Sequence, residues 1–182
     1  MRAIRCVMSL VIAAFFSTAS AQDPRPQDDT APPPLRTISR EERALIDAER
    51  DSKDRIKLTL VLATAHLTTT ETETTRQEYE KAAAAAGRYW ALLEDAFAFL
   101  KPMKSDSNKT RDLYKRVELA LRAHGPRLAT IRRTTPVEYS VWIKEIEDLA
   151  RKGRTEALNS FYGHTVVRDQ TESSRKEDKP KP

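Results

Sequence analysis

The chain of 182 residues contains a single cysteine, Cys6, which lies in the first apolar segment. Cleavage of an N-terminal signal peptide after Ala21 would leave a mature protein with no cysteine at all. Such a protein has no disulfide, no thiolate nucleophile, no Cys-ligated zinc and no haem attached through sulfur. The shortage of cysteine therefore excludes four functional classes for the mature chain.

Long hydrophobic runs are also scarce, and the one at the N-terminus has the pattern of a secretory signal peptide. Arg2 and Arg5 form a short basic start, an apolar stretch covers 6–16, and small residues precede a cleavage site after Ala21. The uncharged run contains 17 residues, whereas a membrane-spanning helix needs about 20. We therefore predict that residues 1–21 are a signal peptide, that the protein is exported to the periplasm or the medium, and that no transmembrane segment remains.

The two ends of the mature chain have the composition of unfolded segments. Residues 22–38 contain five prolines, which favour an extended linker. Residues 164–182 are polar and charged and offer almost no apolar surface to bury. We predict that both segments are disordered and that they flank one domain of residues 39–163, about 125 residues long, a size that suits a single domain.

Glycine is scarce too, with four residues in the whole chain, and the central region is rich in the strong helix formers Ala, Leu, Glu, Lys and Arg. Apolar residues there recur at intervals of three and four, which is typical of helices that bury one face. Four such seams predict helices over 39–67, 76–104, 109–133 and 136–162. The fold class is therefore predicted to be all-α.

The connection between the first two predicted helices is placed at 68–75. This stretch contains threonine and glutamate and no hydrophobic residue, so it offers little to a core. Extending the first seam from Leu60 and Leu67 by sevens reaches Thr74, which is out of phase with the next seam at Tyr79. We therefore predict a turn here and reject one continuous helix through both segments.

Local capping patterns mark the expected helix starts. Ser39 with Glu42, and Thr75 with Glu78, each match a capping box, in which the two side chains bond to each other's backbone N–H groups. Pro126 falls inside the third predicted helix. A proline removes one helical hydrogen bond and clashes with the preceding turn, but the seam stays in phase across it, so we predict a kink rather than a break.

The connections between the four predicted helices are short, which places successive helices side by side and antiparallel. We therefore predict an up-down-up-down four-helix bundle with disordered termini. The alternative is a repeat-like pair of stacked helical hairpins, because 39–104 and 109–162 are similar in size. No residue signature is shared between the two halves, so the closed bundle is preferred.

The sequence contains no motif of a cofactor site or of a catalytic centre. A di-iron centre in a helical bundle needs Glu-x-x-His pairs, and none of the three histidines has a glutamate three residues before it. No Gly-x-Ser-x-Gly element is present. His124 lies on a core seam beside Gly125-Pro126, where we expect it to bond a carbonyl freed by the proline. We predict a protein that is not an enzyme and that holds no metal and no cofactor.

Positive charge is concentrated on one predicted helix. The segment 109–133 carries eight basic and two acidic residues, whereas the other helices are close to balanced. At 100° per residue, four of the cations share one face nearly opposite the core seam, and Lys109, Arg116 and Arg127 form a second row nearer the edge. The four cations of the first face are Arg111, Lys115, Arg122 and Arg133. Such a face attracts anionic partners, and acids on neighbouring helices can also balance it.

Two hypotheses for function follow. The first is an exported, non-enzymatic helical protein that acts as an interaction or scaffold module of the cell envelope, with an unknown envelope protein or an anionic surface as its partner. The alternative is a carrier of a small molecule, metal or cofactor in the bundle interior around Trp90, Trp142 and His124. Without its signal the chain has 30 basic and 27 acidic residues, a net charge of +3, and we expect no nucleic-acid partner.

Overall fold

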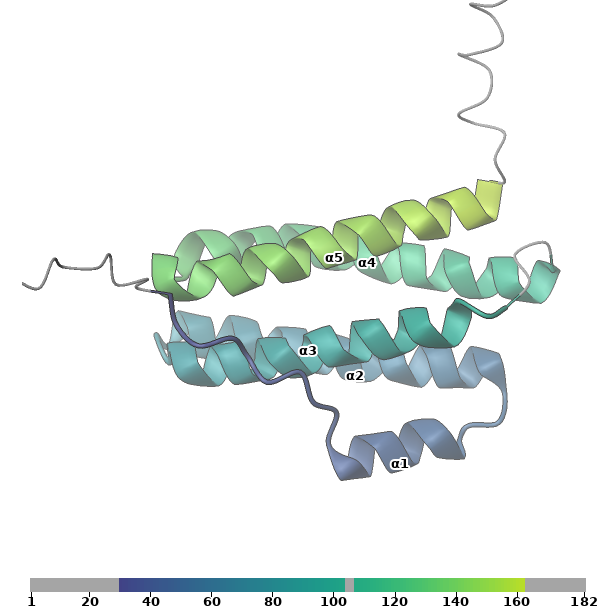
Figure 1. Cartoon of the computed structure of the whole chain (residues 1–182), viewed down its shortest axis with the longest axis horizontal. Coiled ribbons are helices and arrows are strands. Elements are labelled where there is room, and N and C mark those ends of the chain that lie inside the picture. The colour runs from purple at the N-terminus through teal and green to yellow at the C-terminus, as the bar shows by residue number, and fades with distance from the viewer. Residues whose placement is uncertain (1–29, 104–106, 163–182) are drawn as a thin grey trace, which may run out of the picture.

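The computed structural model describes residues 30–103 and 107–162, which form five α-helices and no strand (Figure 1). In chain order the helices are α1 (Arg40–Ala48), α2 (Ser52–Thr75), α3 (Tyr79–Leu100), α4 (Asn108–Thr134) and α5 (Val137–Tyr162). The prediction of an all-α protein is confirmed, and the predicted number of four helices is wrong. The predicted signal peptide and C-terminal tail lie outside the described residues. Among the helices described, none is long and apolar enough to cross a membrane.

The helices form two hairpins that pack against each other. α2 pairs with α3 and α4 pairs with α5, and these two pairs have the most extensive contacts among the described helices. The hairpins meet along two further lines, α2 against α4 and α3 against α5 (Figure 1). In a bundle whose helices follow one another around a ring, α3 and α4 would also be full neighbours, but here they make few contacts. The arrangement differs from the predicted bundle and corresponds to the alternative of two stacked hairpins, with α1 added beside α2.

The first predicted helix, 39–67, is two helices in the structure. α1 begins as expected at a capping box: Ser39 Oγ accepts from the Glu42 N–H at 3.2 Å, and the Glu42 carboxylate accepts from the Ser39 N–H at 3.1 Å. The chain then leaves the helix, and Asp51 starts α2 by accepting from the Lys53 N–H at 2.7 Å. An aspartate at this position satisfies an N–H group that has no partner within the helix. A local side chain thus explains a break that the apolar spacing did not show.

The predicted turn at 68–75 is also wrong, because α2 continues to Thr75. Thr70 and Thr74 are buried and extend the seam beyond Leu67. Along α2, threonine hydroxyls donate to the carbonyl four residues earlier, which satisfies the hydroxyl and leaves the methyl group to pack. These threonines are Thr59, Thr64, Thr68, Thr69, Thr70, Thr72 and Thr75. Thr70 therefore takes the place of a hydrophobic residue in this seam, whereas the buried Thr74 hydroxyl has no hydrogen-bond partner among the described residues.

The turn between α2 and α3 lies at 76–78. Gln77 has a backbone φ of 63°, a left-handed conformation that often ends a helix. The predicted capping box of Thr75 and Glu78 is absent: the Thr75 hydroxyl donates to the Glu71 carbonyl at 2.9 Å, and the Glu78 side chain makes no capping bond at the start of α3. α2 and α3 are therefore separate helices, but the chain reverses later than the composition indicated.

Residues 30–39 form an extended segment, here called the N-terminal strap, that crosses α3 on its way from α5 to α1 (Figure 1). The Ala31 N–H donates to the Glu138 carbonyl at 2.9 Å, and the Trp142 indole N–H donates to the Ala31 carbonyl at 2.8 Å. The sequence predicted a disordered linker over 22–38, but residues 30–38 are bonded to the helices. The rest of that linker, 22–29, lies outside the described residues.

The strap contacts α3 at Gly87, where two backbones meet. A Cβ atom on Gly87 would lie 2.4 Å from the Leu35 carbonyl oxygen, so only glycine fits. Nearby, the Arg36 guanidinium lies 3.8 Å from the centre of the Trp90 ring and pairs with Glu94 at 3.1 Å. Contacts with α3 and α5, which the local composition does not reveal, therefore order this proline-rich segment.

α4 agrees closely with its prediction. It begins after Ser107, whose hydroxyl oxygen accepts from the Thr110 N–H at 3.1 Å, and it continues through Pro126 to Thr134. The predicted seam is buried: Val117, Leu121, His124, Leu128 and Ile131. The apolar spacing therefore identified the inner face of this helix, and its cationic residues lie on the other faces.

Candidate binding face on α2 and α4

The four cations predicted to form a face for an anionic partner are all exposed on α4. They are Arg111, Lys115, Arg122 and Arg133. Arg133 bonds to the Thr130 hydroxyl within the helix at 3.2 Å, and Arg122 pairs with Glu118 at 2.9 Å. Their exposure suits a surface role, and the identity of what they bind stays a prediction.

Arg122 also joins α4 to α5. Glu118 is only 5% exposed, and its Oε1 accepts from Arg122 and from Arg154 of α5, each at 3.0 Å. Burial raises the pKa of Glu118, but hydrogen bonds from the two arginines outweigh burial and hold the pKa below its usual value. Arg122 is therefore committed in part to a contact that joins α4 to α5.

The second row of α4 cations faces α2. Lys109 pairs with Asp51 at 3.3 Å, and Arg127 bonds both carboxylate oxygens of Glu71, at 2.7 and 2.6 Å. Bidentate pairs of this kind are among the stronger charged hydrogen bonds. Arg116 lies between these two in the row and makes no ion pair within the part of the chain that the structure describes. The row is therefore neutralised at both ends and left positive in the middle.

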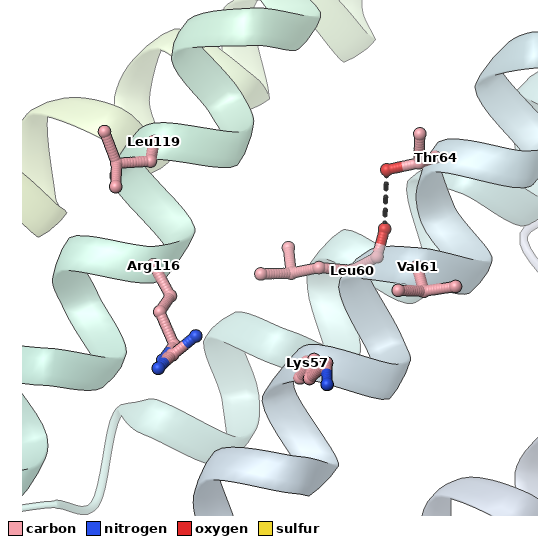
Figure 2. Close-up of a pocket in the computed structure, with 6 residues that line it drawn as sticks. All are labelled: Lys57, Leu60, Val61, Thr64, Arg116 and Leu119. Carbon is pink, nitrogen blue, oxygen red and sulfur yellow. Dashed lines mark hydrogen bonds between the residues drawn. The ribbon is translucent and has the colours of Figure 1, made fainter.

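An open groove of about 440 Å³ lies between α2 and α4 at this level, and we call it the α2/α4 groove (Figure 2). Its lining consists of Lys57, Leu60, Val61 and Thr64 from α2, and Arg116 and Leu119 from α4. Val61 is 56% exposed and Leu119 is 50% exposed. Two large aliphatic side chains that are half in water form the rim of the groove.

Two cations occupy one end of the α2/α4 groove. Figure 2 shows Lys57 and Arg116 on one side of Leu60, with Leu119 and Thr64 on the other. Lys57, like Arg116, makes no ion pair with any residue in 30–103 or 107–162. Among the described residues, no acidic side chain lines this groove. The groove thus combines an apolar wall with a local excess of positive charge.

Thr64 connects the groove to a buried chain of hydrogen bonds. Its hydroxyl donates to the Leu60 carbonyl at 2.7 Å, so the 3.1 Å contact with His124 Nε2 requires the imidazole N–H to donate to Thr64. The 3.1 Å contact at Nδ1 then requires the Tyr89 hydroxyl to donate to His124. We assign a neutral imidazole with its proton on Nε2 from these donor roles. The chain of bonds joins α2, α3 and α4.

His124 is 3% exposed. Burial, reinforced by the positive charge of Arg127, lowers the pKa of His124 to about 4, against a usual value of 6.5, and Glu71 opposes this only weakly. Burial also raises the pKa of the Tyr89 phenol. Both groups are therefore neutral near pH 7. The expectation that His124 bonds a carbonyl freed by Pro126 is wrong, because both ring nitrogens bond to side chains of other helices.

The side chains invoked for a ligand in the interior are engaged in internal contacts. The Trp90 indole N–H donates to Glu94 at 2.9 Å, and that of Trp142 donates to the strap at Ala31. His124 is bonded on both nitrogens. The polar groups on which an interior carrier site would depend therefore already have partners within the protein.

A second groove, of about 590 Å³, lies mainly between α3 and α5. Lys101 and Lys152 line it together with Glu94 and Glu156. Acids and bases are therefore balanced in its lining, and its charge gives no preference for an anion. The two grooves therefore differ in charge, because cations are accompanied by acids in the lining of the second groove and are not in that of the α2/α4 groove.

The chain matches no protein-family model, no curated protein and no solved structure. Within the described residues, no group of three or more His, Cys, Asp or Glu side chains lies close enough together to hold a metal ion. Inference about function therefore depends on the residues of the binding face itself.

The sequence identified one half of this face. It placed Arg116 in the row beside the exposed cations of α4, but it did not single out Lys57 or Val61 on α2. One signal was present: Val61 adjoins the seam residue Leu60 and cannot share its buried face, because neighbouring helical residues point 100° apart. Which cations lack an acidic partner is decided only when α2 and α4 pack together.

Proposed function

We propose that the protein is an exported, non-enzymatic interaction module of the cell envelope that binds an anionic partner through the α2/α4 groove and the neighbouring cations of α4. The observation that supports this most directly is the pair Lys57 and Arg116. They line one groove, no acid lines it with them, and exposed aliphatic side chains adjoin them.

The electrostatic argument follows from the ion pairs on either side of the groove. Lys109 and Arg127 each have an acid on α2, at Asp51 and Glu71. Two unpaired cations in one groove repel each other, and an anion placed between them removes that repulsion and gains attraction from both. Arg116 has no such acid among the described residues, and a negatively charged partner can supply the missing counter-charge.

A retention experiment on polyglutamate resin tests the proposal. The matched variants replace three cations each: K57Q/R111Q/R116Q at the face, and K144Q/R151Q/K152Q on α5. The wild-type protein should elute at moderate salt, because exposed charges are screened over ~8 Å at physiological ionic strength. The face variant should elute at much lower salt, and the α5 variant should elute with the wild type.

Equal elution of the two variants would overturn the proposed face, because both lose the same net charge. Melting temperatures provide the folding control. Both variants should melt close to the wild type, since an exposed ion pair contributes about 0–1 kcal/mol.

Export is tested separately by expressing the full chain in a host with a secretory pathway. The protein recovered outside the cytoplasm should begin at Gln22, because the predicted cleavage follows Ala21. Mass spectrometry of the intact protein measures this directly. A chain that keeps residues 1–21, or that stays in the cytoplasm, would contradict the envelope assignment without bearing on the groove.

A further inference from the structure

We propose that the α2/α4 groove binds a single-chain amphiphile with an anionic head group, such as a fatty carboxylate or an alkyl phosphate. The inference rests on the proposed function, because it names the class of anion that the groove takes. The head group would lie between Lys57 and Arg116, and the hydrocarbon chain would cover Leu60, Val61 and Leu119.

The head-group end follows from the positions of the two cations. Lys57 extends from α2 and Arg116 from α4, and both lie at the same end of the groove beyond Leu60 (Figure 2). A guanidinium presents several N–H donors in a plane that matches the oxygens of a carboxylate or phosphate, and an ammonium adds a compact second charge. An anionic group with two or more oxygens can therefore bond to both side chains at once.

The chemistry of the wall favours a hydrocarbon chain over an extended peptide. Beyond the two cations, Thr64 has the only polar side chain that lines the groove within the described part of the chain. Its hydroxyl already donates to the Leu60 carbonyl and accepts from His124. An extended peptide carries an N–H and a C=O on nearly every residue and needs partners for them. A hydrocarbon chain needs none, and it removes the exposed surface of Val61 and Leu119 from water.

The size of the groove fits a small ligand. Its volume of about 440 Å³ falls within the range of roughly 300–1,000 Å³ that is usual for small-molecule sites. On α2 the lining runs from Lys57 to Thr64, which spans about 10 Å at 1.5 Å per residue. The ion pairs Asp51–Lys109 and Glu71–Arg127 flank the lining at either end of the seam.

The α3/α5 groove provides a natural control within the same molecule. It is larger, at about 590 Å³, and it also contains aromatic and aliphatic side chains. Its two lysines, Lys101 and Lys152, are accompanied by Glu94 and Glu156. Both grooves therefore have sufficient volume and an apolar lining. Only the α2/α4 groove, of the two, has positive charge that no acid in its lining balances.

Titration with laurate, below its micelle concentration, tests the inference on protein purified from an exporting host. Isothermal calorimetry gives the affinity, and methyl NMR locates the ligand. We expect shifts of the Val61 and Leu119 methyl resonances. We also expect at least a tenfold loss of laurate affinity in K57Q/R116Q and no change in K101Q/K152Q, which removes two charges from the other groove.

Three further ligands distinguish the contribution of the head group to affinity from that of the hydrocarbon chain. Dodecyl phosphate should bind at least as well as laurate, because it carries the same chain and a more highly charged head. Acetate has the head without the chain, and dodecyl maltoside has the chain without the charge, so both should bind at least tenfold more weakly. Acetate binding as tight as laurate, or maltoside binding as tight as laurate, would overturn the inference.

The outcome also separates this inference from the proposed function. If laurate fails to bind, or binds equally to K57Q/R116Q and the wild type, the amphiphile site is overturned. The proposed function still stands if polyglutamate retention depends on the same residues, and a Glu-rich helical peptide that binds there would then define the ligand class. If laurate does not bind through these residues and polyglutamate retention does not depend on them either, both proposals are overturned.

Discussion

The two lines along which the hairpins meet are built from different chemistry. Where α3 meets α5, small residues allow close approach: a Cβ on Gly153 would lie 2.0 Å from the Phe97 ring, and the strap lies against Gly87. Where α2 meets α4, polar side chains bridge the helices through Thr64–His124 and Glu71–Arg127. An ion pair between Asp51 and Lys109 bridges the same line at the start of α2, and the α2/α4 groove lies between that pair and Thr64.

The two sides also differ in how far the strap covers them. The strap covers part of the α3/α5 side, and Trp142 and Trp90 bind it there. No described segment covers the α2/α4 side, and its exposed aliphatic residues remain on the rim of the groove. The two hairpins thus meet along one line that the strap covers in part and whose groove is balanced in charge, and along a second line whose groove is uncovered by any described segment and positively charged.

The largest expected difference between the two lines is their response to acid. The pKa of His124 is about 4 in the folded protein, against 6.5 for an unperturbed histidine. Between these values the unfolded chain binds the proton and the folded chain does not, so the free energy of unfolding falls as pH drops from 6.5 to 4. The loss is on the order of 3 kcal/mol, at about 1.4 kcal/mol per pKa unit. Urea unfolding at a series of pH values measures it.

The variant H124Q isolates this contribution, because glutamine keeps a donor and an acceptor but has no proton to gain. Its free energy of unfolding should depend less steeply on pH between 6.5 and 4 than that of the wild type. Depressed carboxyl groups such as Glu118 also lose stability in acid, but they affect both proteins alike. Equal slopes would show that the α2/α4 line does not depend on a neutral His124.

On the α3/α5 side, the contact between Gly87 and the strap should be the most sensitive to substitution. The substitution G87A places a methyl group against the Leu35 carbonyl, and backbone atoms cannot move aside as a flexible side chain does. We expect a loss of roughly 2 kcal/mol, within the range for overpacked sites, together with faster amide exchange of the strap.

The control is G125A. Apart from its chain neighbours and the backbone of its own helix, no described atom lies within 4 Å of a Cβ at Gly125, which is inside a helix. Alanine should change the stability there by less than about 1 kcal/mol, because its higher helix propensity is opposed by the contact of its Cβ with the Pro126 ring. If G87A and G125A changed the free energy of unfolding in the same direction and by similar amounts, the requirement for glycine at position 87 would not come from the close approach of the strap.

The smallest expected effect concerns the far end of the strap. W142F removes the indole N–H that donates to the Ala31 carbonyl, and one hydrogen bond is worth about 1 kcal/mol. The Ala31 amide, which bonds to Glu138, should exchange faster in this variant. W90F is the matched control, because it removes an indole bond to Glu94 and leaves Ala31 untouched. Faster Ala31 exchange in both variants would show that the strap responds to packing and not to this bond.

Local sequence determined the helices where short-range interactions decide the structure. The seam of α4, its start after Ser107 and its passage through Pro126 depend on side-chain spacing and on one cap, all within a few residues. The capping box of Ser39 and Glu42 is equally local. The all-α class and the exposed position of Arg111, Lys115, Arg122 and Arg133 follow from the same periodicity.

Only the tertiary structure decided features that depend on a second segment. Thr70 and Thr74 look polar in the sequence, yet they are buried because α3 and α4 supply a core around α2. Residues 30–38 have the composition of a flexible linker, yet their backbone packs against Gly87 and accepts a hydrogen bond from Trp142. Arg116 resembles its neighbours in the sequence and differs from them because no acid of α2 reaches it. Burial and charge pairing are properties of contacts between distant residues, and the spacing along one helix does not contain them.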